Sequence, residues 1–111
     1  MSQEKIDNIV IESLKEIMGE DFNILITTYR DDTGKLIQSL SELHKQNNIE
    51  VFTRNAHSIK SSSANVGAMQ VSSLAAELEV QGKTGDISNS LEKINHLSLE
   101  FDMACKELAT L

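Results

Sequence analysis

The chain contains no proline, only five glycines and a single cysteine among its 111 residues. All-β domains use proline and glycine freely in their turns, so their scarcity favours long helices. One cysteine, Cys105, excludes an internal disulfide, and no cysteine–histidine cluster has zinc-site spacing. No stretch approaches the roughly 18 apolar residues of a membrane span. The N-terminal residues mix charged and apolar side chains, unlike a signal peptide.

Positive charge is also in short supply. Seventeen acidic residues against ten lysines and arginines give a formal net charge of −7. Nucleic-acid binding needs a basic patch that neutralises phosphates, and an anionic membrane surface attracts basic segments. We therefore expect a soluble, cytoplasmic monomer that binds neither nucleic acid nor membrane. The chain length is that of one domain, which we place over residues 1–111.

Apolar residues recur with a helical period in five segments, at about residues 6–17, 22–43, 49–66, 71–78 and 87–108. Gly34 lies inside the second segment, but the apolar phase is unchanged across it, which predicts one continuous helix. Asn48 and Asp86 are the predicted N-caps of the third and fifth helices. Because the breaks are short, we expect an all-α fold, an antiparallel up-down-up-down four-helix bundle with a short additional N-terminal helix.

The helical wheel also assigns structural roles to residues that often carry chemistry. Cys105 falls in the apolar stripe of the last segment, so we expect an inert, buried thiol. Met69 and Met103 are predicted to pack within the protein. His44 and His96 have no special setting, and we expect both to be structural, with His44 suited to a helix C-terminus.

His57 is different, because it should point away from the core of the third helix. On an ideal wheel it lies about 140° from the centre of the apolar face. Residues three and four positions away share its face, and these are Arg54, Lys60, Ser61 and Ala64. The histidine is therefore predicted to be accessible, beside two cations and two small side chains.

The surrounding segment also lacks acidic residues. No Asp or Glu occurs from Val51 to Ala76, where random placement of the chain's 17 acids would put about four. Carboxylates would repel a doubly charged phosphoryl group or an acidic partner site. A neutral imidazole can attack phosphorus, and Lys60 is placed to offset negative charge on a phosphate oxygen. The pattern favours a reactive phosphohistidine.

Other chemistries find less support. Hydrolysis by a serine of the run 61–63 needs a base and an oxyanion hole, and neither has a recognisable motif. No glycine-rich loop with the GK[ST] pattern is present, so we expect no ATP site of P-loop type. A di-metal bundle would need inward Glu-x-x-His pairs, which the sequence lacks.

The segment 56–68, AHSIKSSSANVGA, followed by LAAELE at 74–79, resembles the signature of histidine-containing phosphotransfer (HPt) domains. That family has a histidine, then a hydrophobic residue, a lysine and small residues, with a glycine ten positions after the histidine. The resemblance, which is to a stand-alone bacterial HPt protein, implies that His57 is the phosphoacceptor and that Lys60 supports the phosphate. It also implies a polar partner for the imidazole at Glu79.

For partner binding, the resemblance implies Arg54, Ser61, Ala64 and Gly67, with Gly67 ending the helix. The family commonly has glycine where this chain has Ser61. The expected partners are response-regulator receiver domains and a hybrid sensor histidine kinase.

We therefore expect a phosphocarrier of a multistep two-component relay, with no kinase site and no cofactor of its own. The magnesium ion would be bound in the receiver. A helical module that binds receivers or kinases without phosphotransfer is the alternative, and a structural or ligand-binding bundle is a more distant one.

Overall fold

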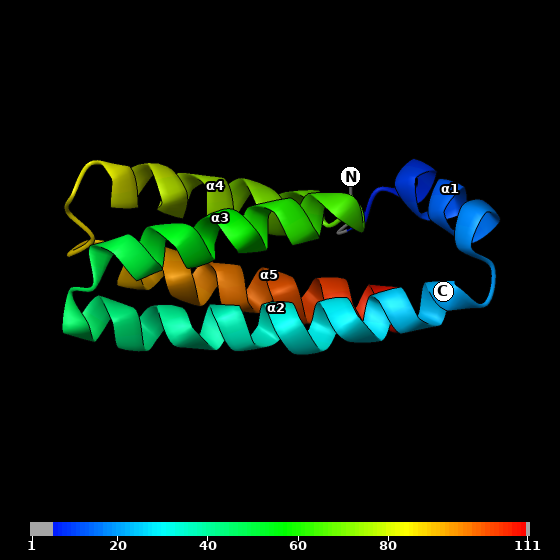
Figure 1. Cartoon of the computed structure of the whole chain (residues 1–111), viewed down its shortest axis with the longest axis horizontal. Coiled ribbons are helices and arrows are strands. Elements are labelled where there is room, and N and C mark those ends of the chain that lie inside the picture. Colours follow the sequence, from blue (N-terminus) through cyan, green and yellow to red (C-terminus); the bar gives the residue numbers. More distant parts are fainter. Residues whose placement is uncertain (1–5, 111) are drawn as a thin grey trace.

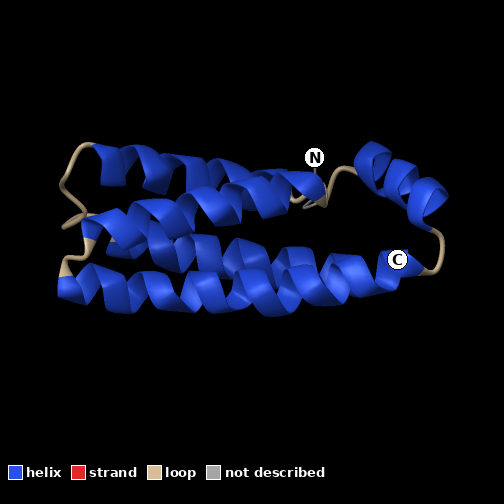
Figure 2. Cartoon of the chain, viewed as in Figure 1, coloured by secondary structure: helices blue, strands red, loops and turns tan. Residues whose placement is uncertain are grey.

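The structure is a computed structural model that describes residues 6–110. Over that range the chain forms five helices and no strand (Figures 1 and 2). They are α1 (Asn8–Met18), α2 (Asp21–Gln46), α3 (Ile49–Asn65), α4 (Met69–Lys83) and α5 (Leu91–Ala109). The predicted all-α class is confirmed.

Four helices, α2 to α5, lie alongside one another on the long axis of the molecule (Figure 1). Helix α3 packs against α2 and α4, and α5 packs against the same two helices. The short helix α1 stands at one end, where it contacts α2. None of the helices formed by residues 6–110 combines the length and apolar character that a membrane crossing requires.

The helix ends follow from local hydrogen bonding. Asn48 caps α3, since its side chain accepts a hydrogen bond from the Val51 amide at 3.3 Å. Asn47, just before it, takes the left-handed conformation that ends α2, with φ of 53°. Helix α2 runs unbroken through Gly34. The predictions of the Asn48 cap and the continuous second helix are confirmed.

The predicted start of the last helix is wrong. Asp86 does not cap α5. Its side chain instead accepts hydrogen bonds from the amide and hydroxyl of Ser88, which closes a local turn. Ile87 is buried from within this loop, and α5 begins at Leu91. The sequence pattern extended the helix because Ile87 keeps the apolar phase without being helical.

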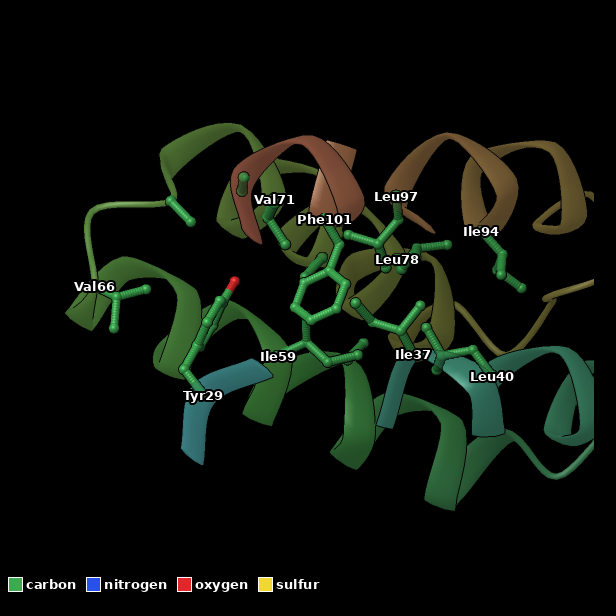
Figure 3. Packing of buried hydrophobic residues seen from close by; sticks show 14 of the residues in the cluster. Tyr29, Ile37, Leu40, Ile59, Val66, Val71, Leu78, Ile94, Leu97 and Phe101 are labelled. Atoms are coloured by element: carbon green, nitrogen blue, oxygen red, sulfur yellow. The ribbon is translucent and has the colours of Figure 1, made fainter. Parts of the chain in front are cut away.

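The core draws on all five helices. Figure 3 shows a part of it, where side chains of α2, α3, α4 and α5 meet. Its largest fully buried side chains include Phe52, Leu40, Ile59, Leu78 and Leu97. Several residues expected on apolar faces are exposed instead, namely Ile9, Ile17, Met69, Leu91 and Met103. Their side chains are accessible at the ends or outer sides of the helices, so the predicted packing of Met69 and Met103 is wrong.

The serine run lies wholly inside α3, as the apolar phase predicted. Ser63 is buried and bonded to the Tyr29 hydroxyl at 2.8 Å, and Ser62 is bonded to Thr33 at 3.0 Å. Two of the three serines therefore join α3 to α2. Because buried hydroxyls need partners, these paired bonds fix how the two helices meet.

Helices α3 and α4 approach closely where Gly82 faces Thr53. A Cβ at position 82 would collide with the Thr53 side chain. A Cβ added at Gly34, within α2, would lie 3.5 Å from the Phe101 ring, which is an ordinary van der Waals contact.

We predict that Gly82→Ala destabilises the protein by about 1–3 kcal/mol through overpacking, despite the better helix propensity of alanine. Gly34→Ala is the matched control, and it should be neutral or stabilising by up to about 1 kcal/mol. Urea unfolding followed by circular dichroism measures both. Equal stability of the two variants would contradict this packing.

Candidate functional site

His57 and Glu79 face each other across the α3–α4 interface. The His57 side chain is 57% exposed, which confirms its predicted outward position. Its Nδ1 nonetheless lies 2.8 Å from Oε2 of Glu79, whose side chain is only 8% exposed. The imidazole is therefore accessible to a partner and fixed in orientation at the same time.

This contact determines the tautomer of a neutral His57. An ionised carboxylate can only accept hydrogen bonds, so Nδ1 must carry the proton. The lone pair is then on Nε2, the other ring nitrogen. An imidazole held in this way presents an unprotonated nitrogen for attack on an electrophile.

Glu79 is itself held by two lysines. Nζ of Lys60, on α3, donates to Oε1 at 2.6 Å, and Nζ of Lys83, one turn further along α4, lies 3.6 Å from Oε2. The hydrogen bond from Lys60 lowers the pKa of Glu79 most, burial of the carboxyl opposes it, and the bond from His57 lowers the pKa further. The net pKa shift is downward, so Glu79 is ionised at neutral pH.

The backbone around the site is fixed by polar contacts between the same two helices. Ser72, on α4, donates to the Lys60 carbonyl at 2.9 Å. The tight turn at Gly67, with φ of +78°, reverses the chain between α3 and α4. Together with the close approach at Gly82, these contacts place Glu79 opposite His57.

The other predicted partner-binding residues do not share one environment. Arg54 and Ser61 are exposed, and Ala64 is half-buried. Gly67 differs from the expectation of a partner contact, because it is buried. Its carbonyl accepts from the Asp7 amide at 2.7 Å, and a Cβ there would crowd Asp7 and Val10. Gly67 therefore acts as the glycine that ends α3 and forms the turn to α4.

The two remaining histidines have settings of their own. Nδ1 of His44 lies 3.0 Å from both the Ile87 carbonyl and the Ser90 hydroxyl, so this side chain joins α2 to the α4–α5 loop. His96 is exposed, with Nε2 3.6 Å from Glu100 on its own helix. Like His57, His96 is exposed beside a poorly exposed glutamate, but only His57 makes a short hydrogen bond, at 2.8 Å, to a carboxylate of a neighbouring helix.

Burial raises the pKa of the half-buried Cys105 thiol to about 11. The thiolate is therefore scarce at neutral pH, which fits the prediction of an inert cysteine. In the part of the chain that the structure describes, no three His, Cys, Asp or Glu side chains come together as a metal site.

The structure shows that the absence of acidic residues near His57 in the sequence does not mean their absence near His57 in space. The acid-free window keeps carboxylates off α3 beyond Glu50 in its first turn, yet one carboxylate, Glu79, reaches His57 from α4. Sequence periodicity did not place Glu79 there, because a wheel describes one helix at a time. Periodicity also gave no indication that Lys83 belongs to the site. The spacing of Glu79 and Lys83 by four residues was the one available signal.

Comparison with known proteins identifies the family and a similar fold. The family model described as "Hpt domain" matches residues 24–110. Among solved structures, the chain is similar to histidine-containing phosphotransfer protein B (HptB) from Pseudomonas aeruginosa PAO1, with a TM-score of 0.93 and 25% identity. That match covers 98% of this chain and 95% of the other. A search of curated protein sequences finds no relative.

The ionised Glu79 predicts a pH-dependent contribution to stability. Its pKa is lowered by folding, so the contribution is complete above the ordinary glutamate value of 4.5 and is lost as pH falls through the lower folded value. We predict that Glu79→Gln lowers the free energy of unfolding by about 1–2 kcal/mol at pH 7. The difference from the parent should shrink as the pH falls below 4.5.

Urea titrations from pH 3 to 8 measure this difference, with Glu77→Gln as control. Glu77 is more exposed and pairs with Lys93 at 3.5 Å, so its substitution should change stability little. A constant difference between Glu79→Gln and the parent across this range would contradict the assignment.

Proposed function

This chain belongs to the Hpt domain family, and we propose that it is a working phosphocarrier of a multistep relay with His57 as the phosphoacceptor. The observation that carries the proposal is the hydrogen bond between His57 Nδ1 and Glu79. It leaves Nε2 as the nucleophilic nitrogen on an exposed ring. A helix bundle of the up-down-up-down type would serve as the rigid support, and the helix contacts and short connections support that topology.

The transfer step needs no acid or base from solution, because no proton is gained or lost. The Nε2 lone pair attacks the phosphorus of an aspartyl phosphate on a receiver domain. The N–P bond forms as the P–O bond breaks, and the aspartate leaves with the electron pair. Nδ1 keeps its proton throughout, so the ring becomes positively charged. Glu79 stabilises that charge from 2.8 Å. Onward transfer to a second receiver is the reverse reaction.

Lys60 supplies the positive charge for the phosphoryl group. It follows His57 by three residues on α3, and its side chain is partly exposed, 35% by area. In the unphosphorylated protein its ammonium bonds to Glu79. Arrival of the phosphoryl group offers Nζ a more highly charged acceptor on the same helix face.

The receiver would approach over the exposed surface of α3 around His57. Arg54 and Ser61 flank the histidine there, with the half-buried Ala64 beside them. Small side chains permit close approach, and the absence of acids from 51 to 76 avoids repulsion of an acidic receiver pocket. The magnesium ion required for transfer would be bound by the receiver, and phosphoryl groups would enter the relay from a hybrid sensor kinase.

We predict that His57→Gln abolishes labelling by a phosphorylated receiver domain and retains the helical circular dichroism signal. The exposed His96 provides the matched control, and His96→Gln should label like the parent. The label should be acid-labile and alkali-stable, as expected for a phosphoramidate. ATP and magnesium without a receiver should give no label.

Label that persists in His57→Gln would exclude His57 as the acceptor. Binding of receivers without any label in the parent would instead favour an interaction module that has no phosphotransfer activity. Direct labelling from ATP would show a kinase site.

Added negative charge should interfere with transfer only on the His57 face. We predict that Ser61→Glu slows transfer from a receiver by about ten- to hundredfold, equivalent to roughly 1–3 kcal/mol, because it repels both phosphate and partner. Asn95→Glu, on the exposed face of α5, is the control and should transfer at the parent rate. Rapid-quench kinetics give both rates, and equal rates would show that the acid-free window has no role in transfer.

A further inference from the structure

The site contains a second lysine, Lys83, that takes no part in the proposed transfer step. Its Nζ lies 3.6 Å from Oε2 of Glu79, the same oxygen that accepts from His57. Lys60 holds the other oxygen, Oε1, at 2.6 Å. The Lys83 side chain is 67% exposed, so burial of apolar surface does not explain its position.

Once the phosphoryl group arrives, the Lys60 ammonium has two possible hydrogen-bond acceptors, the Glu79 carboxylate and a phosphate oxygen. If its ammonium moves to a phosphate oxygen, the poorly exposed Glu79 carboxylate loses its closest partner. A buried carboxylate without a compensating cation is costly, and it becomes a better acceptor for the ring proton of His57. Loss of that proton to Glu79 would remove the positive charge from the phosphorylated ring.

The charges of the cluster support a compensating role for Lys83. Before transfer, two lysines and one carboxylate leave an excess of one positive charge around a neutral imidazole. Transfer adds about two negative charges on phosphate and one positive charge on the ring. With Lys83 the cluster ends close to neutral, and without it one negative charge remains.

We propose that Lys83 is a positioning residue for phosphotransfer, which holds the Glu79 carboxylate when Lys60 turns to the phosphoryl group. This inference rests on the proposed function of His57. The spacing supports it, because a glutamate followed four residues later by a lysine is the favourable order on a helix. Lys83 is also in the last turn of α4, where the helix dipole favours a cation.

The test compares Lys83→Gln with the parent in the equilibrium between a receiver aspartate and His57. A receiver domain charged with acetyl phosphate, chosen because it labels the parent, serves as the donor. Lys83→Gln should reduce the phosphorylated fraction at His57, lowering the equilibrium constant about two- to fivefold at low salt. The decrease should shrink in high salt, and Lys83→Arg should restore the parent value.

Lys93→Gln is the matched control. Lys93 also pairs with a glutamate of α4, Glu77, at 3.5 Å, so it removes the same charge and a similar ion pair away from the site. It should leave the equilibrium constant at the parent value. An equal decrease of the equilibrium constant in both variants would show that net charge alone causes the effect, and it would overturn the proposal.

A double-mutant cycle with Glu79→Gln asks whether Lys83 acts through the carboxylate. In the Glu79→Gln background, Lys83→Gln should have no further effect on the equilibrium constant. An undiminished effect there would mean that Lys83 acts on the phosphate directly, and it would overturn the positioning role. Imidazole ¹⁵N shifts of the unphosphorylated Lys83→Gln protein should match the parent, because Lys60 still holds Glu79 in that state.

Different results would refute the proposed function of His57 and the proposed role of Lys83. A parent chain that takes no label on His57 would refute the proposed function and this inference with it. A parent that labels normally, together with a Lys83→Gln variant of unchanged equilibrium constant, would refute only the role of Lys83.

Discussion

The buried carboxylate of Glu79 is the constraint on which the site depends. It lies between α3 and α4, orients the imidazole of His57, and holds the ammonium of Lys60. A charge with so little exposure persists only where hydrogen bonds and cations surround it. The close packing of the two helices at Gly82 and the turn at Gly67 are what bring those partners within reach.

The same carboxylate links stability to chemistry. Its ionisation stabilises the folded chain through Lys60 and His57, and it also determines which ring nitrogen of His57 is free to react. A phosphocarrier needs a bond to phosphorus that forms and breaks with little net change in free energy. Under the proposed function, compensating charges around one fixed acceptor, in addition to those around the phosphate, would act in both directions of transfer.

The polar bonds of the serine run show how the remaining sequence serves this arrangement. Ser62 and Ser63 face α2 and bond to Thr33 and Tyr29, whereas Ser61 faces outward beside His57. One helix therefore uses its inner serines to fix its position and leaves its outer serine as part of the accessible surface. The distinction follows from the helical period of α3 and from the polar residues that α2 places opposite it.

Periodicity within single helices determined most of what could be predicted from the sequence. It gave the all-α class, the continuity of α2 through Gly34, the Asn48 cap and the outward direction of His57, because each depends on neighbours within a few residues. It failed at Ile87, which keeps the helical phase from within a loop, and at Met69 and Met103, whose side chains are exposed. Helical phase shows which side chains share a face and does not show what that face meets.

Contacts between α3 and α4 were decided by the tertiary structure alone. The family resemblance pointed to Glu79, but only the packed helices bring its carboxylate to 2.8 Å from His57 and show Lys60 bound to it. The burial of Gly67 and the place of Lys83 in the cluster were likewise beyond the sequence. Their physical basis is the distance between two helices and the rotation of each about its axis, and neither quantity is encoded in the pattern of one helix.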